Sequence, residues 1–253
     1  MSPALETGSA VRLAELIRGA ERAVVLTGAG VSVPSGIPDF RTPGKGIWEK
    51  VNPMEVAHID AFRSSPDRFW QFYADRFASL VDKRPNPAHE AIAELERRGM
   101  IRGVITQNVD RLHRMAGSER VIEMHGSIEH CVCLECGGRV HLDRVLEIIA
   151  EHPGAPECEA CIHPLKPDVV LFGELLPAAA MAEAQALAES ADLMICVGSS
   201  LEVFPVAALP GVTLESGGRV AIVTQGPTAY DREAEVKLAG DVAEELAAVV
   251  AAL

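Results

Sequence analysis

Four cysteines are spaced like the ligands of a zinc ion. Cys133 and Cys136 form one Cys-x2-Cys pair, and Cys158 and Cys161 form a second pair after 21 intervening residues. Each pair can place two thiolates on one tight turn, and four thiolates complete a closed tetrahedral Zn²⁺ site. Because a closed site leaves no position for water, we expect this zinc to be structural. Weaker candidate ligands in the same region are Cys131, His130 and His163.

A glycine-rich turn follows the first strongly apolar run of the chain. The run spans residues 22–27, and Gly28, Ala29 and Gly30 come directly after it. Such a turn lets backbone N–H groups approach a phosphate. The third glycine of the usual dinucleotide fingerprint is missing, because position 33 is Val33. The segment that follows, 31–41, is rich in small and turn-forming residues and is longer than a simple strand-to-helix turn needs.

Polar side chains follow two further apolar runs. Asn108 and Asp110 come just after the run 102–106, and His125 follows the run 121–124. Ligands of open α/β sheets bind at the carboxyl ends of the strands, where these side chains would lie. A histidine there can act as a general base. The alternatives are that Asn108 or Asp110 caps a helix and that His125 is structural.

The positions of these motifs imply alternating strands and helices. Apolar runs at 22–27, 102–106, 192–197 and 219–224 predict buried parallel strands. Helices are predicted over 87–98, with Asn86 as N-cap, over 178–189, and from Asp241, which has capping-box spacing to Glu244, to the end of the chain. This alternation predicts an α/β fold with a parallel sheet and helices on both faces.

Two stretches interrupt the alternation. Residues 42–53 are rich in Gly, Pro and Lys and predict a mobile loop. Residues 131–165 are rich in Cys and Pro and predict an inserted small module that a metal holds together.

Composition excludes several classes of protein. The 253 residues are enough for one large domain or two small ones, and the net charge of −13 disfavours nucleic-acid binding. We expect no membrane segment, because no apolar run reaches about 18 residues. Clustered cysteines without a secretory signal favour metal binding in the cytoplasm over disulfides.

Taken together, these motifs resemble the sirtuin family. The resemblance covers about residues 10–252 and is carried by five segments: 28–41, 106–117, 125–126, 166–177 and 198–205. It implies a Rossmann-like NAD-binding domain made of 1–41, 85–125 and 166–253. It also implies a small domain with a helical module at 42–84 and a zinc module at 126–165.

Sirtuins are NAD-dependent protein lysine deacylases, and the resemblance assigns roles residue by residue. His125 would be the general base, and Asn108 would act beside it on the nicotinamide ribose. The other NAD contacts would be Gly28, Ala29, Gly30, Ile37, Asp39, Phe40, Arg41, Gln107, Asp110, Gly198, Ser199, Ser200, Thr224 and Gln225. The acyl-lysine peptide would lie along Val170, Phe172, Gly173 and Glu174.

Two positions depart from the family pattern. Thr224 stands where sirtuins usually have an asparagine that contacts the adenine ribose, so we expect weaker NAD binding. Leu175 stands where many members have a polar residue.

A Tyr-x-x-Arg pair bears on the choice of acyl group. In a helix over 67–80, Tyr73 and Arg76 fall within the apolar stripe formed by Phe69, Phe72, Phe77 and Leu80. A hydroxyl and a guanidinium on adjacent turns suit a carboxylate. A structural ion pair, or an arginine whose head reaches water, is the alternative. The pair resembles that of class III sirtuins, which implies removal of succinyl and malonyl groups as well as acetyl.

Two other functions stay open at this stage. One is an NAD-consuming hydrolase or ADP-ribosyltransferase without deacylase activity, and the other is a non-catalytic binding module. The expected partners are acyl-lysine peptides or proteins, and no stable protein partner can be inferred.

Overall fold

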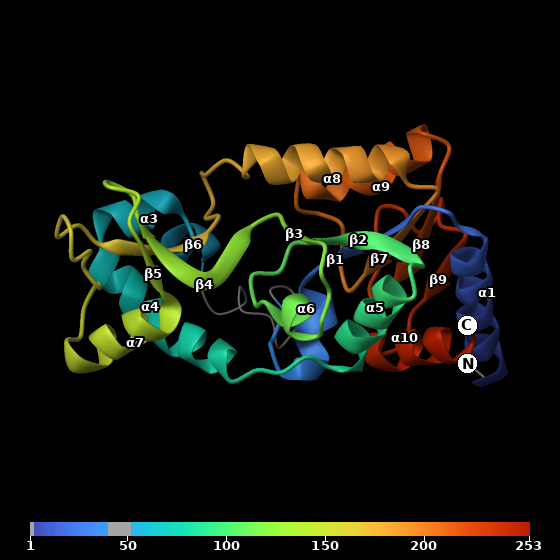
Figure 1. Ribbon diagram of the computed structural model, residues 1–253, viewed down its shortest axis with the longest axis horizontal. Coiled ribbons are helices and arrows are strands. Elements are labelled where there is room, and N and C mark those ends of the chain that lie inside the picture. The colour runs from blue at the N-terminus through green and yellow to red at the C-terminus, as the bar shows by residue number, and fades with distance from the viewer. Residues whose placement is uncertain (1–2, 40–51) are drawn as a thin grey trace.

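A six-stranded parallel sheet forms the centre of the larger of two lobes. The computed structural model describes residues 3–39 and 52–253, and Figure 1 shows the two lobes along its long axis. The strand order is β3-β2-β1-β7-β8-β9. The strands are β1 (Ala23–Thr27), β2 (Ile101–Thr106), β3 (Val121–Glu123), β7 (Leu193–Val197), β8 (Arg219–Val223) and β9 (Val236–Leu238). This order makes the chain wind outward in two directions from β1 and β7, as in Rossmann-like folds.

Burial explains why the apolar runs became central strands. All five residues of β1 and all five of β7 are buried, and the two strands pair in parallel from Ala23 opposite Leu193 to Thr27 opposite Val197. A strand covered on both faces needs apolar side chains in both directions. The four predicted strands are therefore confirmed.

Helices cover both faces of the sheet (Figure 1). One core cluster joins α1 (Pro3–Gly19), α5 (Pro87–Arg97) and α10 (Val242–Ala251) to one face. The other cluster joins α8 (Ala178–Ser190), α9 (Leu209–Glu215) and the 3-10 helix η3 (Val206–Ala208) to the opposite face. Two more short helices lie at the strand ends, η1 (Ala29–Ser35) and α6 (Leu112–Met115). The predicted α/β class is confirmed.

Helix capping follows the sequence pattern with one difference. Asn86 caps α5, since its side chain accepts a hydrogen bond from the Ala88 N–H at 2.8 Å. Asp241 caps α10 by accepting from Ala243 and Glu244. A carboxylate also reaches back to the start of this helix, but it belongs to Glu245, which accepts from the Gly240 N–H at 3.0 Å.

The small lobe combines a three-stranded antiparallel sheet with helices. The strand order is β5-β4-β6, with β4 (Gly126–Cys133), β5 (Arg139–His141) and β6 (Leu165–Val169). The helices are α2 (Pro53–Val56), α3 (Ile59–Ser64), α4 (Pro66–Val81) and α7 (Leu142–Glu151). Trp70 of α4 is fully buried in the shared core, and its indole N–H donates to the Leu165 carbonyl at 2.7 Å. This contact ties the helices of the small lobe to its sheet.

The small lobe also contains a helix that the sequence reasoning missed. The helix α7 buries Leu142 and Val145 against the core of this lobe. It lies inside the stretch 131–165, where the Cys- and Pro-rich ends dominated the interpretation. Most of the predicted loop 42–53, residues 42–51, lies outside the described residues.

Candidate functional site

The loops after β1 and β7 pack against each other at the point where the sheet changes direction. The Gly30 N–H donates to the Gly198 carbonyl at 2.8 Å. Gly198 has a φ of 61°, and a Cβ on it would lie 2.2 Å from the Val31 nitrogen. Only glycine fits this approach. The close contact leaves the carboxyl ends of both strands facing one cleft, where α/β folds bind their ligands.

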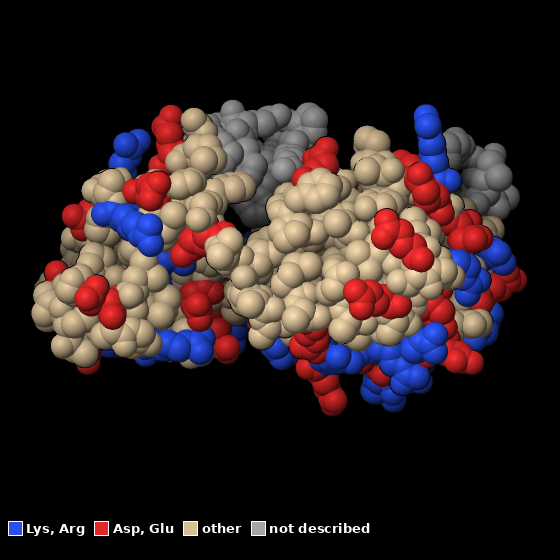
Figure 2. Space-filling view, turned by 90° about the horizontal axis from the view of Figure 1, so that it is seen from above, with Lys and Arg blue, Asp and Glu red and all other residues tan. Residues whose placement is uncertain are grey.

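A cleft of about 1700 Å³ opens at these strand ends and extends to the small lobe. Figure 2 shows the surface hollowed between the lobes. The cleft brings together the predicted cofactor and substrate residues Gly28, Ala29, Gly30, Ile37, Asp39, Tyr73, Arg76, Gln107, Asn108, Asp110, His125, Val170, Phe172, Gly173, Glu174, Gly198, Ser199, Ser200, Thr224 and Gln225. Phe40 and Arg41 lie outside the described residues.

His125 is held with one ring nitrogen bonded and the other open. Its Nδ1 lies 2.9 Å from the Gln107 carbonyl oxygen, which can only accept, so Nδ1 carries the proton and donates. Nε2 is then an unprotonated acceptor, and it has no hydrogen-bond partner among the described residues. Burial lowers the pKa of His125, although the bond to Gln107 opposes this shift. The result is a neutral imidazole with its basic nitrogen available to a ligand.

The Asn108 amide is fixed by two acceptors beneath the cleft. Its Nδ2 donates to the Gly28 carbonyl at 3.2 Å and to the Ser32 hydroxyl at 3.1 Å. Both amide hydrogens are thereby used, so the amide orientation follows from the hydrogen bonds. Oδ1 has no protein partner in the described part of the chain. Asn108 therefore offers the cleft a hydrogen-bond acceptor, as a sugar hydroxyl would require.

Asp110 combines two of the roles considered from sequence. Its Oδ1 accepts from the Leu112 N–H at 2.9 Å, a capping contact made from the residue before Arg111, the N-cap of the short helix α6. Its Oδ2 accepts from the Ser32 hydroxyl at 2.6 Å and lies against the cleft. Burial raises the pKa of Asp110, with the bonds from Ser32 and Leu112 opposing. Capping and a place in the site are therefore compatible for this residue.

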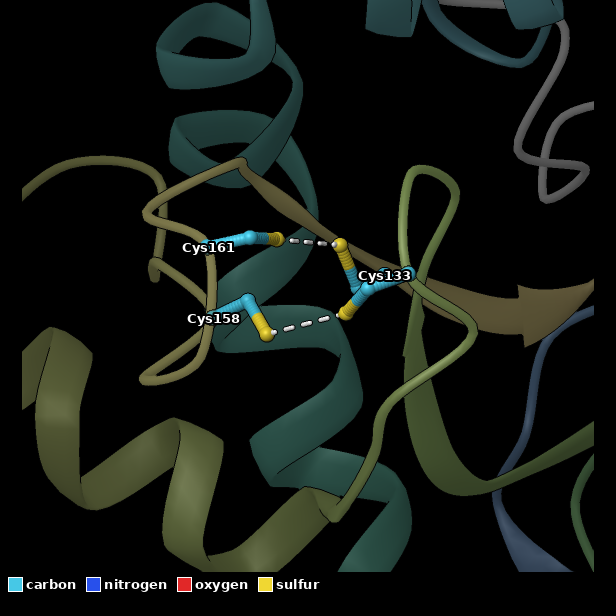
Figure 3. A group of neighbouring side chains, drawn as sticks. Cys133, Cys158 and Cys161 are labelled. Atoms are coloured by element: carbon cyan, nitrogen blue, oxygen red, sulfur yellow. Dashed lines mark hydrogen bonds between the residues drawn. The ribbon is translucent and has the colours of Figure 1, made fainter.

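The four paired cysteines converge in the small lobe, and three of them are labelled in Figure 3. The sulfurs of Cys133, Cys136, Cys158 and Cys161 all lie within 4.8 Å of one another. The Cys133–Cys161 distance is 3.4 Å and the Cys136–Cys158 distance is 3.6 Å. Tetrahedral zinc with Zn–S bonds of about 2.3 Å separates its sulfurs by roughly 3.8 Å, so the cluster fits one Zn²⁺. Cys131 is buried in the core and does not belong to the cluster.

Comparison with known proteins gives the family. The Sir2 family model matches residues 28–205. This chain belongs to the Sir2 family. It is 44% identical to "NAD-dependent protein deacetylase 1" of Pyrobaculum aerophilum, over 92% of this chain and 91% of the relative. It is 42% identical to "NAD-dependent protein deacylase 2" of the same organism, over 95% and 94%. A solved structure titled "Sir2-p53 peptide-NAD+" superposes with a TM-score of 0.88 at 41% identity, covering 95% of this chain and 96% of that one.

The cleft segment predicted to hold the substrate, residues 170–174, is hydrogen-bonded to both lobes. The Val170 N–H donates to the His125 carbonyl at 2.8 Å, which places the segment beside the imidazole. Phe172 forms a strand-like bridge with His58, in which its N–H donates to Ala57 and its carbonyl accepts from Ile59, both at 2.9 Å. Beyond this bridge, Leu175 is 93% exposed at the rim.

The Tyr-x-x-Arg pair lines the cleft in a different way from the one expected. Tyr73 is partly buried, its ring stacks on Phe77, and burial raises its pKa to about 12. Arg76 is exposed, so the expectation that it lies on a buried face was wrong. Its guanidinium lies 3.6 Å from the centroid of the Phe72 ring and donates to the Phe72 carbonyl. No carboxylate of the described residues pairs with it, which argues against the structural ion pair.

Ser32 is the residue of this Sir2 site that the sequence reasoning missed. Its hydroxyl joins Asn108 to Asp110 and is almost fully buried. The available signal was its position two residues after Gly30, within a turn already suspected of facing a ligand. Elsewhere, no helix of the described residues has the length and apolarity needed to cross a membrane.

Proposed function

We propose that this Sir2 protein uses NAD to remove acyl groups from lysine side chains of proteins, with His125 as the general base. The observation that carries the proposal is the open Nε2 of a neutral, oriented imidazole in the same cleft as the glycine turns and Asn108. The relatives named as NAD-dependent deacetylases and deacylases support the reaction class.

The cleft residues fit a dinucleotide. The glycine turn at 28–30 and the segment 198–200 would lie against the phosphates and ribose, because glycines let the backbone N–H groups approach the ligand. Asn108 Oδ1 would accept from a ribose hydroxyl, and Asp110 would face the nicotinamide. The segment at Thr224 and Gln225 would meet the adenine ribose, where the threonine offers one hydroxyl. When bound, NAD supplies an activated anomeric carbon with nicotinamide as the leaving group.

The protein residues position the reactants and move one proton. His125 accepts the proton of a ribose hydroxyl at Nε2, and this makes the hydroxyl a nucleophile toward the acyl carbon. The bond from Nδ1 to the Gln107 carbonyl holds the ring in place and stabilises the imidazolium that forms. The segment 170–174 would align the acyl-lysine beside His125 and exclude water. The acyl-to-lysine C–N bond would then break with consumption of one water molecule, and the products would be free lysine, nicotinamide and O-acyl-ADP-ribose.

The acyl specificity extends to negatively charged groups. Tyr73 and Arg76 line the cleft on the small-lobe side, and the Arg76 guanidinium has no acidic partner among the described residues. A succinyl or malonyl carboxylate would draw the guanidinium away from the Phe72 ring, since an exposed cation–π contact is worth only about 0.5–1 kcal/mol. A charged bond to the carboxylate is stronger.

The two lobes would have different functions. The large lobe would be the NAD-binding domain (1–41, 85–125 and 166–253), and the small lobe would consist of the helical module 42–84 and the zinc module 126–165. The zinc site is structural, because its four thiolates leave no position for a substrate. The cytoplasmic location is inferred from the sequence and stays a prediction.

Mass spectrometry of matched acetyl-lysine and succinyl-lysine peptides tests this function. We expect NAD-dependent loss of both acyl groups with the corresponding O-acyl-ADP-ribose, and we expect His125→Ala to remove both activities while the fold is retained. NAD cleavage with both peptides unchanged would instead identify an NAD hydrolase or ADP-ribosyltransferase. Full activity of His125→Ala would refute the assigned base.

A further inference from the structure

The N-terminus of α5 holds a buried histidine in one tautomer. The Asn86 backbone N–H donates to Nδ1 of His89 at 3.4 Å, which completes the capping box of this helix. An N–H group cannot accept, so Nδ1 must be unprotonated. The neutral ring then carries its proton on Nε2. That nitrogen lies 3.4 Å from the Ser32 hydroxyl oxygen.

The other contacts of Ser32 show that its hydroxyl oxygen accepts the hydrogen bond from His89 Nε2. The hydroxyl proton of Ser32 goes to Asp110 Oδ2 at 2.6 Å, since a carboxylate accepts. The amide of Asn108 already donates to the hydroxyl oxygen at 3.1 Å. Because His89 Nε2–H supplies the second donor, the hydroxyl donates once and accepts twice. An oriented chain therefore runs from the α5 cap through His89 and Ser32 to Asp110.

The surroundings keep His89 uncharged. The residue is fully buried, and burial lowers its pKa to about 4. The nearest aromatic neighbour is the imidazole of His113, whose centroid lies 4.9 Å away and whose pKa burial lowers to about 3. Among the described residues, His89 forms no ion pair with Asp110, and the Ser32 hydroxyl lies between them. A neutral donor near pH 7 orients the Ser32 hydroxyl without adding a charge next to NAD.

We propose that His89 is a positioning residue, which fixes the Ser32 hydroxyl and through it the Asn108 amide and the Asp110 carboxylate in the orientation that binds NAD. The inference rests on the proposed contact of Asn108 and Asp110 with NAD. The inference makes NAD binding depend on a residue of the core helix α5, since His89 is not among the residues that line the cleft.

Steady-state kinetics with separate variation of NAD and peptide test the inference. His89→Phe keeps a ring but removes the donor, and we expect the KM for NAD to rise about 3- to 10-fold, the range of one neutral hydrogen bond. The KM for the peptide should stay within twofold. His89→Gln retains an N–H near the place of Nε2 and should recover most of the NAD affinity. Ile92→Val, one turn further along α5 and also fully buried, is the control that lowers stability without changing the KM for NAD.

A double-mutant cycle with Ser32→Ala asks whether His89 acts through Ser32. We expect the double variant to bind NAD no more weakly than Ser32→Ala alone. Additive losses, an unchanged KM in His89→Phe, or a glutamine variant as defective as the phenylalanine variant would each overturn the proposal. Asn108→Ala tests the proposed NAD contact separately from the role of His89. If Asn108→Ala leaves NAD binding unchanged, the proposed function fails. If Asn108→Ala loses NAD binding while His89→Phe binds NAD normally, only the positioning role of His89 is refuted.

Imidazole ¹⁵N spectra of the wild-type protein test the tautomer without relying on a folded variant. We expect the His89 signals, assigned by their loss in His89→Gln, to show a protonated Nε2 and a bare Nδ1. They should not titrate between about pH 5.5 and 8.5. A protonated Nδ1, or titration near the ordinary histidine pKa of about 6.5, would contradict the inferred chain.

Discussion

The Lys166 ammonium lies 3.0 Å from the Glu174 carboxylate and links β6 to the segment 170–174, which we propose as the acyl-lysine site. Lys166 is almost completely buried, and Nζ also donates to the Val169 carbonyl at 2.6 Å. The same carboxylate oxygen accepts from the Leu171 N–H at 2.9 Å. The Lys166–Glu174 ion pair thus holds the turn that connects β6 to the rim of the cleft.

Replacing Lys166 should loosen the cleft segment 170–174. Lys166→Met leaves Glu174 without its cation, and we expect a loss of about 2 kcal/mol in the free energy of unfolding, less than for a fully buried pair because the carboxylate is partly exposed. The KM for the acyl peptide should rise while the KM for NAD stays constant. Adding Glu174→Gln to Lys166→Met should restore part of the stability. Thermal unfolding and peptide kinetics measure both effects, and an unchanged stability of Lys166→Met would rule out the structural role.

We expect Arg76 to determine whether charged acyl groups are removed. We expect Arg76→Met to lose at least tenfold in kcat/KM for the succinyl peptide and to keep the acetyl activity within twofold, because only the succinyl group has a carboxylate to pair. The control is Arg63→Met on α3, an exposed arginine of the same lobe that does not line the cleft. Equal loss of both activities in Arg76→Met would mean that the arginine acts on the fold and not on the acyl group.

The pH profile should report the protonation state of His125. Burial lowers the pKa of this imidazole below the ordinary value of about 6.5, and the base must be neutral to accept a proton. We therefore expect the acidic limb of kcat/KM to be centred below pH 6.5. Rates of the acetyl peptide in a constant-ionic-strength buffer measure the profile. An acidic limb centred above pH 7 would conflict with the assignment.

Much of this fold can be predicted from the sequence because it depends on local sequence patterns. The strand runs predict the sheet since a doubly covered strand must be apolar throughout, and the cysteine spacing predicts the cluster since two thiols on one turn need that separation. Helix α7 was not predicted from the sequence because its apolar face packs in a small core that it shares with α4. The burial of that face can be recognised only when the positions of β4 and β6 are known.

The polar network beneath the cleft could not be predicted in the same way. Ser32, His89 and Asp110 come from three separate segments, and their contacts depend on how η1 packs against α5. The orientation of Arg76 was wrong for a related reason. Helical periodicity assigned it to the apolar stripe, but the residues of α4 that are buried are Phe69, Trp70 and Phe77. Arg76 lies to one side of this buried face, so its side chain folds back over Phe72 and stays exposed.

The buried histidine His113 should make the protein less stable in mild acid. Burial lowers its pKa to about 3 in the folded protein, so between that value and the unfolded pKa of about 6.5 the unfolded chain binds the additional proton. Stability is therefore lost as the pH falls below 6.5, by about 2 kcal/mol at pH 5 for this one residue.

His113→Gln isolates this contribution. Other groups titrate in both proteins and cancel in the comparison, so we expect the drop in unfolding free energy from pH 7 to pH 5 to be about 2 kcal/mol smaller in the variant. Chemical denaturation at the two pH values measures it. If both proteins lose the same amount, His113 is not held neutral in the folded state.

The two cysteine turns differ at the residue after the second ligand. Gly137 follows Cys136 with φ of 73°, and Ile162 follows Cys161 with φ of 62°. A β-branched residue is strained in this left-handed region, by roughly 1–2 kcal/mol. Ile162 is 65% exposed, so little apolar burial compensates for the strain.

We therefore expect Ile162→Gly to stabilise the zinc-loaded protein by about 0.5–1 kcal/mol, after the larger chain entropy of glycine is subtracted. Zinc release to a competing chelator should also slow, because the second turn is already suited to its ligand geometry. Gly137→Ile is the reciprocal change and should accelerate release. Thermal unfolding and chelator competition give the two readouts, and a less stable Ile162→Gly would show that the isoleucine side chain contributes packing that outweighs its backbone strain.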